Sequence, residues 1–224
     1  MSILQITNLH KSFNDGNSFH EVIKDLSLLV NSNETIIIMG PSGSGKTTLL
    51  NLISMIEKAD HGSIKFNGNS LDSPTSESID QLRSKFLGIL FQSNNLLPEF
   101  TVNENLIIPY EINKIKDHHD PIKLLKNFGL ENKVDYYPNQ LSAGEAQRIS
   151  LIRAIINKPS LILADEPTAN LDEENINVMI TFIKSIKKKY ATSFIVTTHD
   201  QRLCDIADII LYLDNGKLSE RKKN

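Results

Sequence analysis

Apolar runs separated by polar turns divide the chain into alternating strands and helices. Two long segments, 3–13 and 21–30, predict strands joined by a turn at 14–17. Helical periodicity follows residue 45 to about residue 57 and spans 174–190. Short apolar runs predict buried strands at 35–39, 63–66, 161–164, 193–197 and 209–213. Strands that alternate with helices are typical of a largely parallel sheet, so the pattern predicts an α/β fold.

The middle of the chain, from 93 to 156, is mostly helical in pattern. Prolines interrupt it at Pro98, Pro109, Pro121 and Pro138. We interpret this stretch as a helical subdomain inserted into a single domain of residues 1–224. The remaining segments, 1–92 and 157–224, would then form the sheet-containing core.

The composition is consistent with one domain and excludes some classes of function. The chain has 224 residues, of which 40% are hydrophobic and 23% charged, enough to bury a core. The net charge of -3 gives no strong basic field, so no nucleic-acid partner is expected. The single cysteine, Cys204, cannot form an internal disulfide, which fits a reducing cytosol. We expect neither a signal peptide nor a membrane span, because no apolar run reaches about 18 residues.

A glycine-rich loop follows the predicted strand at 35–39 and precedes a predicted helix. It matches the phosphate-loop pattern G-x-x-x-x-G-K-[ST] at every position. Such a loop turns backbone N–H groups toward phosphate, and the helix N-terminus adds a positive dipole. The expected nucleotide-binding residues are Gly40, Ser42, Gly43, Ser44, Gly45, Lys46, Thr47 and Thr48. Lys46 would contact the terminal phosphates and Thr47 a Mg²⁺ ion, so the chain is predicted to bind a nucleoside triphosphate.

Two carboxylates follow the apolar run at 161–164. We expect this strand to lie beside the one that leads into the phosphate loop, so that Asp165 reaches the Mg²⁺ ion. Glu166 could then deprotonate an attacking water, a role typically worth about 10²–10⁴-fold in rate. The alternative is an acidic turn after a core strand, which the phosphate loop earlier in the chain disfavours.

Ser142 and Glu145 form the pattern of a capping box ahead of an apolar helix. The same helix start could also bind an anion. The two roles are compatible, because a serine hydroxyl can accept from the backbone while it donates to a phosphate.

The run Asn132-Lys133-Val134-Asp135 matches the N-K-x-D pattern that reads guanine in GTPases. In those proteins the pattern follows a hydrophobic strand, whereas here it lies in the helical stretch. We therefore expect adenine, and hence ATP, as the nucleotide.

These motifs occur in the order found in the ATP-binding-cassette ATPases, and the resemblance covers essentially the whole chain. It rests on the phosphate loop and on five further segments, Phe91-Gln92, Leu141-Ser142-Ala143-Gly144-Glu145, Ala164-Asp165-Glu166-Pro167-Thr168, Asn170-Leu171-Asp172 and Thr198-His199-Asp200. The resemblance implies a P-loop NTPase fold of the ABC type, with an N-terminal antiparallel β subdomain and an inserted helical subdomain.

The resemblance also implies a role for each matching residue. Glu166, His199, Gln92 and Lys46 would be catalytic, with His199 at the γ-phosphate. Phe13 would stack on adenine. The Mg²⁺ ligands would be Thr47, Gln92 and Asp165.

Two cassettes of this family meet head to tail, so a second copy is the implied partner. Ser142 and Gly144 of one copy would close the site of the other, and Asp172 would line the seam. The chain departs from the family at Ala143, where the family has glycine, and at Glu145, where it has glutamine. Alanine is accepted in a first helical turn, and Glu145 preserves the capping box, so an active ATPase is expected.

The stretch 91–105 resembles the lipoprotein-releasing LolD group most. The implied function is ATP hydrolysis that powers lipoprotein release, with integral-membrane permease subunits as partners and a peripheral location on the cytoplasmic face of the inner membrane. Alternatives are MacB-type or antimicrobial-peptide exporters, an FtsE-like regulatory ATPase, and a soluble cassette that acts without transport. Leu96, Leu97 and Phe100 would either contact the membrane subunit or be buried in the helical stretch.

Overall fold

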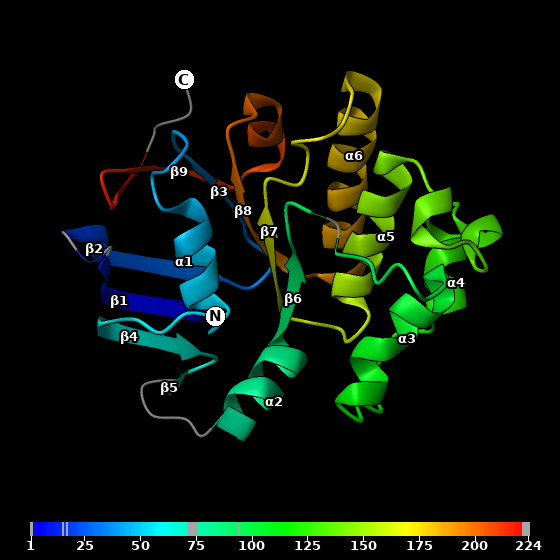
Figure 1. The fold of residues 1–224 in the computed structure, drawn as a ribbon, viewed down its shortest axis with the longest axis horizontal. Helices are drawn as coiled ribbons and strands as arrows, with labels where there is room; N and C mark the ends of the chain where they lie inside the picture. Colours follow the sequence, from blue (N-terminus) through cyan, green and yellow to red (C-terminus); the bar gives the residue numbers. More distant parts are fainter. Residues whose placement is uncertain (1, 15, 17, 71–75, 94, 221–224) are drawn as a thin grey trace.

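The computed structural model describes residues 2–14, 16, 18–70, 76–93 and 95–220. Figure 1 shows a parallel sheet at the centre of the molecule. The antiparallel sheet and α1 (Lys46–Ile53) lie on one side of it, and α5 (Ala143–Ile155) and α6 (Glu173–Tyr190) lie on the other. The predicted turn at 14–17 falls partly outside the described residues.

The first sheet is antiparallel, as predicted for its first two strands. Its order is β2-β1-β4-β5. The strands are β1 (Ser2–Asn14), β2 (Phe19–Asn31), β4 (His61–Phe66) and β5 (Asn69–Ser70). Strand β1 pairs with β2 through Phe13 and His20, which places Phe13 near the end of the hairpin.

The second sheet has the order β10-β9-β3-β8-β7-β6 and is parallel except for β10. Its strands are β3 (Thr35–Met39), β6 (Leu87–Leu90), β7 (Leu161–Asp165), β8 (Ser193–Thr198), β9 (Ile209–Asp214) and β10 (Lys217–Glu220). The expectation that β7 lies beside β3 is wrong, because β8 lies between them. The chain leaves β7 through α6 and returns as the neighbouring parallel strand, and this crossover fills the place next to β3.

Strand β3 is apolar throughout because its two faces are covered by two different cores. Ile37 and Met39 pack with α5, α6 and the helical stretch. Ile36 and Ile38 pack with α1 and the antiparallel sheet. Alternate residues of a strand point to opposite faces, so a strand covered on both sides loses the polar half of its pattern.

The helical stretch contains α3 (Val102–Ile112), α4 (Pro121–Asn127) and α5, with 3₁₀ turns at Glu131–Lys133 and Pro138–Gln140. Leu124 and Leu125 of α4 share one core with Ile162 and Phe194 of the parallel sheet. The division of the chain into 1–92 plus 157–224 and an inserted 93–156 stays a prediction.

Several local predictions need correction. Helix α1 ends at Ile53 rather than near residue 57, since Met55 has a left-handed φ of 59°. The sequence pattern also missed α2 (Ser76–Phe86), β5, β6 and β10. Strand β6 is short and contains Gly88, where a Cβ atom would lie 2.2 Å from the carbonyl oxygen of Ala154 on α5. Gly88 interrupts the apolar pattern that would have predicted this strand. The same glycine allows α5 to pack against β6.

Candidate active site

The phosphate loop connects β3 to α1, and its backbone requires glycine at three positions. Gly43 and Gly45 have φ values of 79° and 99°, a region that favours glycine. Gly40 lies so close to β9 that a Cβ atom there would be 2.3 Å from the carbonyl oxygen of Leu213. The N-terminus of α1 has no side-chain cap, so the N–H groups of its first turn remain available to an anion.

Two side chains of the loop are buried in a way that fits a phosphate ligand. The ammonium of Lys46 donates to the carbonyl oxygens of Gly40 and Pro41, at 2.9 and 3.1 Å. The buried hydroxyl of Ser44 has no hydrogen-bond partner among the described residues. A buried polar group without a partner calls for one, and a phosphate oxygen would satisfy it.

Asp165 receives two hydroxyl hydrogen bonds at the end of β7. Thr47 at the start of α1 donates to Oδ2 at 2.8 Å, and Thr197 of β8 donates to Oδ1 at 2.6 Å. Thr47 and Asp165 thus reach each other although β8 lies between β7 and β3, the strand that leads into the phosphate loop. Hydroxyl and carboxylate oxygens are the donors that Mg²⁺ takes in proteins, so this pair fits the predicted metal.

Glu166 is held between two other predicted catalytic side chains. Its Oε2 lies 2.9 Å from Nδ1 of His199, and its Oε1 lies 3.7 Å from the ammonium of Lys46. The Glu166 N–H donates to the carbonyl oxygen of Thr197 at 2.9 Å. Its φ is 45°, a left-handed value that a residue with a side chain seldom adopts. The strained turn directs the carboxylate toward the phosphate loop.

One open cavity of about 740 Å³ brings most of the predicted residues together. Its lining combines the phosphate loop with side chains from the ends of four other segments, Phe13, Gln92, Asp165, Glu166 and His199. Val22 of β2 and Pro41 also line it and were not predicted, because no motif marks Val22 and Pro41 is a variable position of the phosphate-loop pattern. The volume and the mixture of an aromatic ring, loop amides and carboxylates are suited to a nucleotide.

Phe13 is supported by a charged cluster that the sequence did not indicate. The ammonium of Lys11 lies 5.1 Å from the centre of the Phe13 ring. The same ammonium is 2.7 Å from Glu57 and 3.6 Å from Asp60. The hydrogen bond to Glu57 raises the pKa of Lys11, which keeps the buried cation charged.

Ser142, Gly144 and Asp172 do not line this cavity. Ser142 caps α5 as predicted, accepting from the Glu145 N–H at 3.2 Å while its own N–H donates to Glu145 at 2.9 Å. Ala143 is in the first turn of α5, where alanine is unstrained. Asp172 caps α6 by accepting from the N–H of Asn175.

The N-K-x-D run does not form a base-reading site in the described chain. It lies at and after the 3₁₀ turn Glu131–Lys133, away from the residues that line the large cavity. Lys133 instead forms an ion pair of 3.1 Å with Glu145 of the capping box. This residue therefore supports the start of α5.

A smaller cavity of about 250 Å³ adjoins the first and shares Gln92 and Glu166 with it. Gln147 of α5 is buried against it. Gln92 thus lies between the nucleotide cavity and the start of α5.

Comparison with known proteins agrees with this geometry. The profile of the ABC transporter family matches residues 23–169. The lipoprotein-releasing system ATP-binding protein LolD of Buchnera aphidicola (strain APS) is 40% identical, and the match covers 96% of each chain. LolD of Legionella pneumophila (strain Lens) is 38% identical over 98% of each chain.

A solved structure extends the comparison to three dimensions. The dimeric ATP-binding cassette MJ0796, bound to ADP and Pi after hydrolysis, superposes with a TM-score of 0.88. It is 28% identical, and the match covers 99% of this chain and 100% of that one. The family profile spans more than half of the chain, and the relatives match it over nearly its full length. The chain therefore belongs to the ABC transporter family as one of its ATP-binding, ATP-hydrolysing cassettes.

Proposed function

We propose that this cassette powers the release of lipoproteins from a membrane, as one of two identical ATPase subunits bound to a membrane permease. Several relatives of nearly equal length are named as ATP-binding proteins of a lipoprotein-releasing system. The observation that carries the ATPase role is the cavity in which Glu166 and His199 lie beside the phosphate loop and its Lys46.

The predicted site residues of the cavity have separate roles in the proposed reaction. The loop N–H groups and Lys46 bind the β- and γ-phosphates of ATP. Glu166 accepts a proton from the attacking water, and His199 donates a hydrogen bond to the γ-phosphate. Thr47, Asp165 and Gln92 would hold Mg²⁺, which neutralises developing phosphate charge when bound. Phe13 stacks on the adenine ring.

A second copy would complete the site. Ser142, Gly144 and Asp172 are outside the cavity of their own chain, so they are available to the ATP of a partner. The start of α5 offers backbone N–H groups and the Ser142 hydroxyl, which suit a phosphate. The dimeric state of the MJ0796 cassette supports this arrangement.

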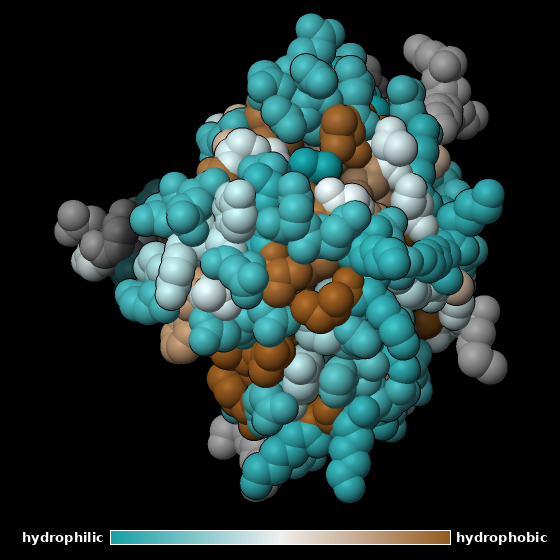
Figure 2. Space-filling model, turned by 90° about the vertical axis from the view of Figure 1, so that its right-hand side faces the viewer, coloured by the Kyte–Doolittle hydropathy of each residue, from teal (hydrophilic) through white to brown (hydrophobic). Residues whose placement is uncertain are grey.

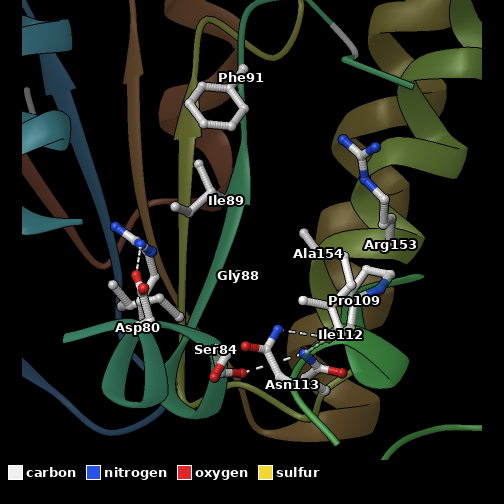
Figure 3. A pocket seen from close by; sticks show the side chains of 13 residues that line it. Asp80, Ser84, Gly88, Ile89, Phe91, Pro109, Ile112, Asn113, Arg153 and Ala154 are labelled. Atoms are coloured by element: carbon white, nitrogen blue, oxygen red, sulfur yellow. Dashed lines mark hydrogen bonds and ion pairs between the residues drawn. The ribbon is translucent and has the colours of Figure 1, made fainter. Parts of the chain in front are cut away.

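The permease is proposed to dock on a groove of about 450 Å³ beside β6 (Figure 3). Strand β6 contributes Ile89, α2 contributes Asp80, and α3 and α5 contribute Ile112 and Arg153. Ile112 is 73% exposed and would add an apolar contact beside this groove. Hydrophobic patches between hydrophilic side chains are visible on the face formed by α3 and α4 (Figure 2).

The loop before α3 adds two more apolar contacts. Leu97 and Phe100 are 39% and 40% exposed, whereas Leu96 is buried in the core, so for Leu96 the structure favours burial over contact with a partner. The buried amide of Asn105 holds this loop by bonding to Leu97, Phe100 and Thr101. Asn105 thus ties the loop to α3, and in this arrangement the side chains of Leu97 and Phe100 are exposed to solvent.

The proposed location is the cytoplasmic face of the inner membrane. Within the described part of the chain, no helix has the length and apolar character needed to cross a bilayer. The proposed permease would hold the cassette at the membrane.

The proposal can be tested by reconstitution. The chain would be co-expressed with the permease of a lipoprotein-releasing system and placed in proteoliposomes that carry an acylated lipoprotein. We expect ATP-dependent release of the lipoprotein, its loss in Glu166→Gln, and weakened co-purification for a Leu97→Asp, Phe100→Asp double variant. Hydrolysis by the cassette without any release of lipoprotein would contradict the proposed cargo. Normal hydrolysis by Glu166→Gln would contradict the assigned base.

A further inference from the structure

Helices α5 and α6 begin side by side, and Gly144 lies directly against Asn175. A Cβ atom at Gly144 would fall 2.2 Å from Oδ1 and 2.6 Å from Cγ of Asn175. Both distances are far inside van der Waals contact, so only glycine fits here while Asn175 keeps its position. The side of Gly144 that a side chain would occupy thus faces its own chain.

Asn175 cannot easily move aside, because its amide holds Asp172. Nδ2 donates to both carboxylate oxygens of Asp172, at 2.9 and 3.0 Å. The backbone N–H of Asn175 donates to Oδ1 of Asp172 at 2.8 Å. Rotation of the amide away from Gly144 would break the two side-chain bonds.

The opposite side of the α5 start is supported independently. Lys133 forms an ion pair with Glu145, and Glu145 accepts from the N–H of Ser142. The guanidinium of Arg148 donates to the carbonyl oxygen of Gly144 at 3.3 Å. Asn175 therefore lies where this supported helix start packs against α6.

We propose that Asn175 is a positioning residue that fixes Gly144 of α5 relative to Asp172 of α6. The inference rests on the proposed dimer, in which the two segments face a second copy. With Asn175 in place, the segment that closes the partner's ATP site and the residue at the seam keep one spacing. A change at either one is transmitted to the other through a single amide.

The test is a double-mutant cycle in the Glu166→Gln background, with ATP-dependent dimerisation as the readout. Gly144→Ala is expected to weaken dimerisation at least about tenfold, because its methyl group displaces Asn175 from Asp172. Asn175→Ala removes the same two side-chain hydrogen bonds to Asp172 and should weaken dimerisation by a similar factor, so the double variant should be little weaker than either single variant. Asn175→Asp should weaken dimerisation on its own, since a carboxylate cannot donate to Asp172. Asn177→Ala, an exposed position on the same helix, is the matched control.

A second readout separates positioning from a general loss of structure. Binding of a fluorescent ATP analogue to the monomer should be unchanged in every variant, because neither Gly144 nor Asn175 lines the nucleotide cavity. Additive losses of dimerisation in the double variant would overturn the proposal. If the Glu166→Gln chain does not dimerise with ATP, the proposed dimer fails. In that event, additive shifts in thermal unfolding by the two substitutions would overturn the contact as well, and coupled shifts would support it.

Discussion

Nδ1 of His199 lies 2.9 Å from Oε2 of Glu166, so the carboxylate at the end of β7 is aligned by a residue that follows β8. The His199 N–H also donates to Oε2, at 3.3 Å. The other oxygen of Glu166 faces Lys46. The carboxylate is therefore held in place by the two side chains that are proposed to contact the γ-phosphate.

Replacing His199 by alanine should slow hydrolysis without abolishing ATP binding. The variant loses a donor to the γ-phosphate and releases Glu166, and we expect kcat to fall by about 10²–10³-fold. Steady-state kinetics and binding of a fluorescent ATP analogue would measure the two effects. His61→Ala, an exposed histidine of β4, is the control. Equal losses in binding and in kcat would contradict the assigned role.

Thr47→Val should remove the metal dependence of ATP binding. Valine keeps the shape of threonine but lacks the hydroxyl that donates to Asp165. In the unaltered chain, ATP with Mg²⁺ should raise the melting temperature more than ATP with EDTA, and in Thr47→Val the two should be nearly equal. Thr181→Val on the exposed face of α6 controls for the lost hydroxyl. A metal-dependent shift that survives in Thr47→Val would contradict the assigned ligand.

Glu145→Gln should reduce stability at neutral pH and have no effect in acid. The N–H of Ser142 and the Lys133 ammonium hold the pKa of Glu145 below its usual value. A carboxylate with a lowered folded pKa stabilises the fold above its unfolded pKa and loses that effect as the pH falls through the folded pKa. Glutamine preserves the capping box, so we expect a loss of about 0.5–1 kcal/mol at neutral pH.

Urea unfolding at neutral pH and below about pH 4 would measure this difference. The exposed Glu99 provides the control, as Glu99→Gln. A difference between Glu145→Gln and the unaltered chain that persists at low pH would show that shape, not charge, sets the effect.

Lys11→Met should weaken both the fold and the binding of adenine. It leaves Glu57 and Asp60 facing each other without a cation, and we expect unfolding to be easier by about 1–2 kcal/mol, given that both carboxylates are partly exposed. The raised pKa of Lys11 means that its stabilisation is complete below its unfolded pKa and fades only as the pH rises through the folded value. The KM for ATP should rise, because Phe13 loses its support. An unchanged KM would show that the ion pairs of Lys11 do not contribute to ATP binding.

Short-range patterns predicted the parts of the site that one segment determines. The phosphate loop, the capping box at Ser142 and the carboxylates after β7 each depend on a few consecutive residues. Their chemistry can therefore be read without knowing the fold.

What the sequence missed depends on contacts between distant segments. The place of β8 between β3 and β7 follows from the path of α6, which no local pattern specifies. The sequence gives Lys11 no special role, because its partners Glu57 and Asp60 are distant in the chain and approach it only in the fold. Leu96 and Leu97 are adjacent and equally apolar, and the bonds from Asn105 accompany the burial of one and the exposure of the other.

The left-handed backbone of Glu166 lowers the stability of the fold at a position where turnover of ATP needs a carboxylate. A residue with a side chain in this region is strained by about 1 kcal/mol or more, and glycine relieves that strain. Glu166→Gly should thus give a cassette that melts at a higher temperature but no longer turns over ATP. Screens that reward thermal stability alone would drift toward inactive cassettes at this position, whereas selection for turnover must keep the less stable one.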